Sequence, residues 1–143
     1  MLEETQHLLT PLYENEYAAY WLEEDILIQQ HKESASYITL AIAETIVRDR
    51  QLITKGMPTL HLSDMGCLIR GDVDAMEYFV SPESTNDVLA SALCLHNYLQ
   101  FTIVNIFLIY YQRHIPFPTK VVKNRQQGIA WLKEKEREML FKL

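Results

Sequence analysis

Hydrophobic and polar positions along the chain change their period several times, and these changes divide the sequence into strands and helices. Residues 17–22 and 26–31 are short apolar runs separated by three acidic residues, a pattern that predicts a β-hairpin. Pro11 argues against a long helix in residues 1–16, which we expect to form a flexible or loosely docked lead-in. The folded domain is therefore expected to span residues 17–143.

A helical period follows the hairpin. Apolar residues recur every three or four positions from Thr39 to about residue 55, which is typical of an amphipathic helix. Thr39 is the expected N-cap, Gly56 the residue that ends the helix, and Pro58 prevents its continuation. The charged residues of this helix are expected to face solvent: Arg48, Asp49 and Arg50.

Residues 59–79 are the stretch around which we expect the domain to be organised. An apolar run ends at Asp64, an exposed loop is expected to follow, and helical spacing begins after Asp72. The Asp72 carboxylate is a suitable N-cap for that helix. Because partners usually bind at loops that leave the carboxyl ends of central strands, we expect the functional surface here.

The rest of the chain continues the alternation of strands and helices. A surface loop is expected at residues 81–87, a strand at 88–95, a largely buried helix at 98–112, a strand at 119–122 and a final helix capped by Asn124. The order is β-β-α-β-α-β-α-β-α. It predicts a single α/β domain with a mostly parallel sheet of about five strands, an antiparallel N-terminal hairpin at its edge and about four helices.

Composition narrows the class of protein. The 143 residues carry a formal net charge of −6, which argues against a nucleic-acid binder because phosphate contacts need a basic face. Residues 88–112 contain no charged side chain, but polar residues divide them, so a strand and a helix are favoured over a membrane span. The N-terminus lacks a signal-peptide pattern, and Cys67 and Cys94 are expected to be buried free thiols rather than a disulfide, so we expect a cytoplasmic protein.

An ordered set of short motifs carries a family resemblance: YWLEEDILI, LHLSDMG, DAMEYF, NIFLIYY, PFPTKVV and GIAWLKEK. Together they resemble the STAS domain of bacterial anti-sigma-factor antagonists. The similarity is closer to a divergent, mostly uncharacterised bacterial STAS-like group that is also similar to the lipid-carrying CRAL-TRIO fold. The resemblance covers roughly residues 17–135 and implies a STAS-like fold.

The resemblance also implies a non-catalytic regulatory module that binds partner proteins. In STAS antagonists a hydroxyl just after the helix-capping Asp is often phosphorylated, whereas Val73 and Asp74 follow Asp72 here, so the usual phospho-acceptor is missing. We expect a protein partner and a homodimer. The expected partner-binding residues lie in the loop and at the start of the next helix: Asp64, Met65, Arg70, Gly71, Asp72 and Val73.

Two other functions remain open. The domain is alternatively a carrier or sensor of a lipid-like apolar molecule held between the helix at 98–112 and the sheet. Four aromatic residues of that helix would then line a pocket, or else form a core or dimer contact: Phe101, Phe107, Tyr110 and Tyr111. An enzyme that uses Asp64 and His61 is the third possibility, although structural roles for both residues are favoured.

Recognised catalytic and cofactor motifs are missing from the sequence. The five histidines show no metal-ligand spacing, and neither a Gly-rich phosphate loop nor a hydrolase nucleophile elbow is present. We therefore expect neither a metal, a cofactor nor catalytic residues.

Overall fold

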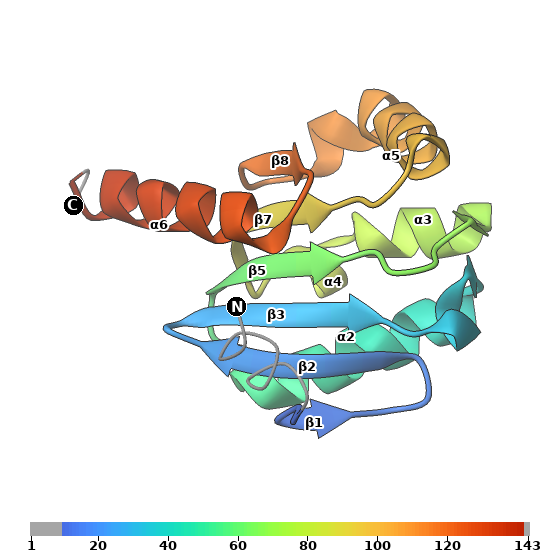
Figure 1. Cartoon of the computed structure of the whole chain (residues 1–143), viewed down its shortest axis with the longest axis horizontal. Helices are drawn as coiled ribbons and strands as arrows, with labels where there is room; N and C mark the ends of the chain where they lie inside the picture. The colour runs from blue at the N-terminus through green and yellow to red at the C-terminus, as the bar shows by residue number, and fades with distance from the viewer. Residues whose placement is uncertain (1–9, 142–143) are drawn as a thin grey trace.

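The computed structural model describes residues 10–141, which form a layered α/β domain (Figure 1). Its strands are β1 (Tyr13–Glu14), β2 (Ala18–Glu23), β3 (Ile26–His31), β4 (Tyr37–Ile38), β5 (Thr59–Asp64), β6 (Arg70–Gly71), β7 (Val88–Cys94) and β8 (Thr119–Val122). Its helices are η1 (Glu33–Ala35), α2 (Leu40–Thr54), α3 (Val73–Phe79), α4 (Pro82–Thr85), α5 (Tyr98–Tyr111), η2 (Gln112–His114) and α6 (Arg125–Phe141).

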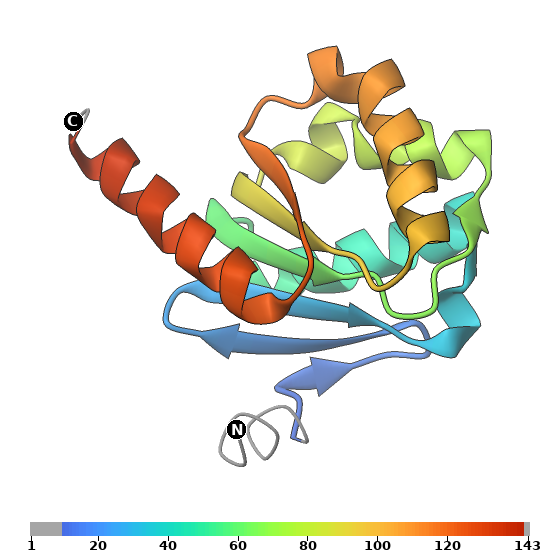
Figure 2. The ribbon, with the colours of Figure 1, turned by 45° about the horizontal axis from the view of Figure 1, so that its top comes forward.

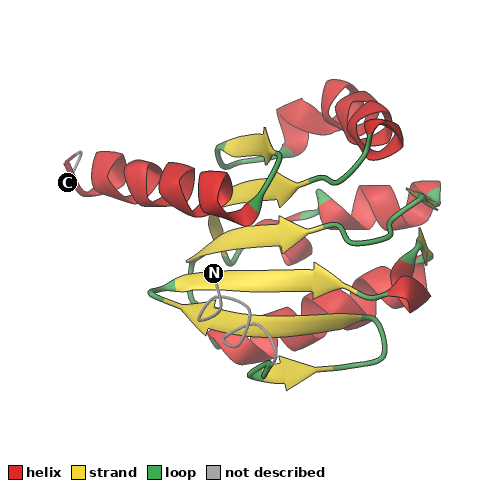
Figure 3. Ribbon diagram, viewed as in Figure 1, coloured by secondary structure: helices red, strands yellow, loops and turns green. Residues whose placement is uncertain are grey.

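The main sheet has the order β1-β2-β3-β5-β7-β8. Strands β2 and β3 form the predicted antiparallel hairpin, and β3, β5, β7 and β8 are parallel, with their arrows pointing the same way in Figure 3. Glu24 and Asp25 both have positive φ, which suits the two-residue hairpin turn between β2 and β3. The predicted fold class and the mostly parallel topology are confirmed.

The described part of the lead-in is attached to the domain. Residues 1–9 lie outside the described residues, but β1 pairs with β2 at the sheet edge. Asn15 Nδ2 donates a 2.7 Å hydrogen bond to Asp49 Oδ2 on α2. The prediction that Asp49 faces solvent is wrong, because its side chain accepts this hydrogen bond and is only 3% exposed. The lead-in therefore contributes an edge strand from residue 13.

Helices cover both faces of the sheet. In Figure 1, α6 lies in front of the strands while α2 and α3 lie behind them, and Figure 2 shows α5 and α6 well apart. Leu60, Leu62 and Ala92 pack toward α6, whereas Leu27 packs with α2. Gly128 allows α6 to lie very close to the sheet, since an added Cβ would contact Leu62 and lie 3.3 Å from Val122 Cγ2.

Polar side chains cap the N-termini of three helices at the positions that the sequence predicts. Thr39 accepts from the Ile42 N–H, Asp72 from the Ala75 N–H, and Asn124 from the Gln127 N–H. Each bond satisfies one of the N–H groups that a first turn leaves without a helical partner, which is why these boundaries are readable from local sequence.

The expected surface loop at residues 81–87 is partly buried. It contains α4, and Asp87 has no exposed surface. Arg50 pairs with Asp87 through Nη2–Oδ1 at 2.7 Å and Nε–Oδ2 at 3.2 Å, and it also donates to the Ser84 carbonyl oxygen. Arg50 was expected to face solvent, but it is 8% exposed because this bidentate ion pair joins α2 to the segment before β7.

Helix α5 is more exposed than its composition predicts. Only Gln100 and Val104 are buried along it, while Tyr98, Ile109 and Tyr110 are 86%, 79% and 76% exposed. Cys67 is also exposed rather than buried, whereas Cys94 is buried, and both are free thiols. Within residues 10–141, no helix combines the length and apolar character that crossing a membrane requires.

Candidate functional site

The loop after β5 has a buried base and an exposed tip. Asp64 is only 4% exposed, so the expectation that it lies on the outer surface is wrong. Arg70 is exposed and its guanidinium lies 5.1 Å from the centre of the Tyr37 ring, and Val73 is 65% exposed. Asp72 caps α3, so of the expected partner-binding residues, Arg70 and Val73 are those most accessible at the surface.

Asp64 is held as a carboxylate by three neighbours. Its Oδ1 accepts from Gly66 N at 3.0 Å and from His96 Nε2 at 2.5 Å, and its Oδ2 accepts from Arg125 Nε at 3.0 Å. Burial acts to raise the pKa of Asp64, but the bonds from His96 and Gly66 and the charge of Arg125 outweigh it, so the pKa is below its usual value. Asp64 therefore joins the ends of β5, β7 and β8.

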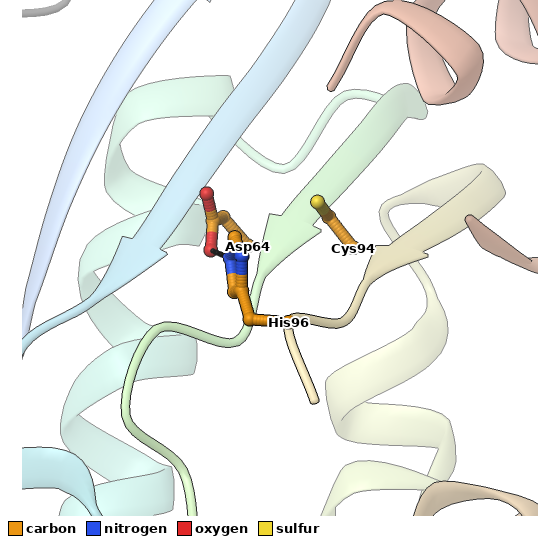
Figure 4. A group of neighbouring side chains, drawn as sticks. All are labelled: Asp64, Cys94 and His96. Atoms are coloured by element: carbon orange, nitrogen blue, oxygen red, sulfur yellow. Dashed lines mark hydrogen bonds and ion pairs between the residues drawn. The ribbon is translucent and has the colours of Figure 1, made fainter. Parts of the chain in front are cut away.

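Three potential metal ligands meet at this point. Asp64, Cys94 and His96 place one ligand atom each within 4.8 Å of the others, and Figure 4 shows the His96 ring against Asp64 with Cys94 on the next strand. Burial and the charge of Asp64 raise the pKa of the Cys94 thiol to about 11, which keeps it protonated. Arg125 supplies the positive charge next to Asp64, so the described contacts of this group form an ion-pair network.

Gln100 fixes the loop to the start of α5. Its Nε2 donates to the carbonyl oxygens of Gly66 and Leu68, at 2.8 and 3.1 Å, and its Oε1 accepts from the His96 N–H at 2.8 Å. Gly66 has φ +52° and an added Cβ would collide with the carbonyl oxygen of His31, so a side chain is not tolerated there. The loop is therefore held on one side by Gln100 of α5 and packs on the other against the end of β3.

A cavity of about 160 Å³ lies between this loop, helices α3, α4 and α5, and the sheet. Its walls are largely apolar: Ile38, Met65, Leu68, Met76, Phe79, Val80, Leu93, Ile103, Val104, Phe107, Leu108, Ile115 and Phe117. Of the four aromatic residues proposed for a pocket, Phe107 lines this cavity, whereas Phe101, Tyr110 and Tyr111 do not. A cavity of this size and composition suits a small molecule.

The floor of the cavity is polar. Along β5, His61 and Ser63 face it while Leu60 and Leu62 face α6, because strand side chains alternate between faces. The register sets His61 beside Ser91, and Ser63 beside Gln29, so polar residues of three strands lie together. Central strands covered on both faces are usually apolar throughout, and this polar row is therefore unusual.

Comparisons with known proteins bear on the family. A family model described as "Domain of unknown function (DUF7793)" matches residues 20–136. The chain belongs to the DUF7793 family. No curated protein matches it. Among solved structures, the DUF7793 chain is similar to an uncharacterised protein of the DUF3478 family with a SpoIIAA-like fold from Shewanella loihica PV-4.

That alignment has a TM-score of 0.58 and 13% identity, and it covers 85% of the DUF7793 chain and 98% of the other. It shows the fold alone, and it confirms the STAS-like architecture that the sequence motifs implied.

The arrangement does not support the enzymatic alternative for the DUF7793 domain. His61 lies on the cavity floor, whereas Asp64 pairs with Arg125 of α6, so the two side chains project from opposite faces of the sheet. Sequence reasoning missed Gln100 as an anchor and Ser63 and Ser91 as floor residues. Polar residues at alternate positions of central strands were the available signal for the floor.

Proposed function

We propose that this DUF7793 domain is a non-catalytic carrier or sensor that binds a small, largely apolar molecule between α5 and the sheet. The observation that carries the proposal is the cavity of about 160 Å³ at that place. An engineered cavity of about 150 Å³ lined by apolar side chains binds benzene, so this volume is enough for a single-ring compound. Both cysteines are free, which supports action in the reducing cytoplasm.

Filling the cavity tests this function. Val104 lines it and is 5% exposed, so Val104→Phe should occupy the ligand's space. We expect native mass spectrometry to detect a small molecule retained by the wild-type domain, and NMR titration with toluene to shift amide signals around the cavity. Both signals should be lost in Val104→Phe. Ile109→Phe, on the exposed side of the same helix, is the control that should retain them.

The proposal fails if toluene leaves the wild-type signals unchanged or if both variants bind it equally. Circular dichroism and thermal unfolding of Val104→Phe would show whether the variant remains folded.

A second candidate, a protein-interaction module, is supported by the exposed loop tip and by the STAS-like fold. Arg70 and Val73 are exposed, while Met65, Leu68 and Gly71 of the same loop line the cavity. A partner that binds this tip would therefore contact a loop whose inner side faces the ligand space. Neither Val73 nor Asp74 offers a phospho-acceptor hydroxyl, so ligand occupancy takes the place of the phosphorylation switch in this scheme.

Affinity capture tests the second candidate. Arg70→Glu combined with Val73→Glu should remove specifically captured proteins, because it reverses one exposed charge and adds another while leaving the Asp72 cap intact. Lys120→Glu, exposed on β8, is a control that reverses one charge away from the loop. Unchanged capture by the loop variant would exclude this surface.

A further inference from the structure

We propose that the cavity selects an uncharged, single-ring molecule that carries a hydrogen-bonding group directed at the polar floor. This inference rests on the proposed function and specifies its ligand. It differs from the expected lipid-like cargo in two respects, because it excludes a long acyl chain and it requires a polar, neutral substituent.

Size sets the first limit. The volume of about 160 Å³ corresponds to one aromatic ring with a small substituent, since about 150 Å³ accommodates benzene. A long acyl chain needs a tunnel several times larger. The aromatic and branched side chains of Phe107, Phe117 and Leu93 form the walls against which a flat ring would pack.

The second limit on the ligand comes from polar groups of the cavity floor that lack hydrogen-bond partners in the protein. Within residues 10–141, the hydroxyls of Ser63 and Ser91 make no hydrogen bond to the protein, and His31 Nδ1 is buried without a hydrogen-bond partner. His61 Nε2 is also buried without a hydrogen bond, although it lies 4.0 Å from Asp87 Oδ2. His61 and His31 are 4% and 6% exposed. A buried polar group that lacks a hydrogen-bond partner destabilises the protein, so a ligand that supplies the partner gains affinity and specificity.

The neighbours of His31 indicate which kind of group is needed. Gln29 Nε2 lies 3.0 Å from His31 Nε2, and an amide nitrogen only donates, so His31 Nε2 accepts. The single proton of the neutral ring is then on Nδ1, which is an unused donor. The ligand should therefore present an acceptor, such as a carbonyl oxygen, to this end of the floor.

The described residues that line the cavity offer no unpaired charged side chain to a ligand. Arg50 borders the cavity, but Asp87 and the Ser84 carbonyl oxygen occupy its guanidinium. Burial lowers the pKa of His31 to about 4 and that of His61 to about 3, the latter with help from the charge of Arg50, so both rings are neutral at pH 7. An ionic ligand would lose its hydration without gaining a counter-charge.

Four compounds of nearly equal shape test the inference by calorimetry or NMR titration at pH 7: cumene, benzamide, benzoate and benzamidine. We expect benzamide to bind at least about ten times more tightly than benzoate or benzamidine. Removing two floor hydroxyls in Ser63→Ala/Ser91→Ala should weaken benzamide binding about 5–160-fold, which corresponds to two hydrogen bonds at roughly 0.5–1.5 kcal/mol each, and leave cumene binding unchanged or tighter. Thr102→Val, on the exposed side of α5, should alter neither compound.

The outcomes distinguish failure of this inference from failure of the proposed function. If cumene binds and is lost in Val104→Phe, but benzamide does not bind or ignores the serine substitutions, the domain binds apolar molecules and the polar selectivity is wrong. Equal affinity for benzoate and benzamide overturns the requirement for neutrality. If none of the four compounds binds, both the inference and the proposed function fail.

Discussion

His31 and His61 are the two histidines that the cavity buries, and they make the protein's stability depend on pH. Their pKa values of about 4 and about 3 lie below the ordinary value of 6.5, because burial disfavours the charged ring. As pH falls below about 6.5, the unfolded chain takes up two protons that the native state does not. The contribution of these two histidines to the free energy of unfolding is therefore fully present above that pH and is lost as the pH falls toward 4.

We predict that the free energy of unfolding falls by about 2 kcal/mol per pH unit between pH 6 and pH 4.5, with about half of this slope from each histidine. Urea unfolding at several pH values measures this slope. His31→Gln and His61→Gln should each remove about half of it, and His114→Gln, which is exposed, should leave it intact. A slope that persists in the double variant would show that other groups cause it. Asp64 and Asp87 add their own loss only at lower pH, because their pKa values are lowered.

At the scale of elements, the loop after β5 depends on α5 through Gln100. We predict that Gln100→Leu destabilises the domain by about 2–3 kcal/mol, because it removes three hydrogen bonds and leaves the Gly66 and Leu68 carbonyl oxygens without their partner. Hydrogen exchange should become faster at the amides of residues 65–71. Asn105→Leu, on the exposed side of α5, is the matched control. Unchanged exchange in Gln100→Leu would mean that the loop is held by other contacts.

Local sequence predicts the elements well but not their tertiary partners. The caps at Thr39 and Asp72 were predictable because each acts on an N–H three residues away. The burial of Arg50 was not, since its partner Asp87 is 37 residues distant and only the fold brings them together. The exposure of α5 likewise escaped prediction, because an all-apolar sequence does not say how much sheet is available to cover it.

The site shows the same division. Asp64 and the helix cap Asp72 stand out in the sequence as acidic residues at element ends, whereas the floor arises from strand register. His61 and Ser91 become neighbours only when β5 and β7 pair, and Gln29 meets Ser63 only through β3. Pairing of non-adjacent strands is information that a single sequence does not display directly.

At the scale of the whole molecule, α5 leaves an apolar surface at the edge of the domain. Tyr98, Leu99, Ile106, Ile109 and Tyr110 are all more than half exposed, and the helix has no charged residue. We propose that two copies associate through it, because an uncharged apolar face is complementary to itself about a two-fold axis.

Sedimentation equilibrium at micromolar concentration should give a dimer for the wild-type protein and a monomer for Ile109→Lys/Tyr110→Lys. Leu140→Lys, at an exposed position of α6, should remain dimeric. A monomeric wild-type protein would contradict the proposed dimer.

The close packing of α6 against the sheet at Gly128 limits how far the sheet can move toward that helix. Helix α6 lies so near β5 and β7 that even a methyl group would displace Leu62, and Ala92 Cβ would be only 3.4 Å away. The sheet is thus backed on that side and has no room to bow outward when its other face is occupied. A bound molecule would therefore rest against a rigid sheet and contact α5 on the opposite wall, the helix whose outer side carries the proposed dimer surface.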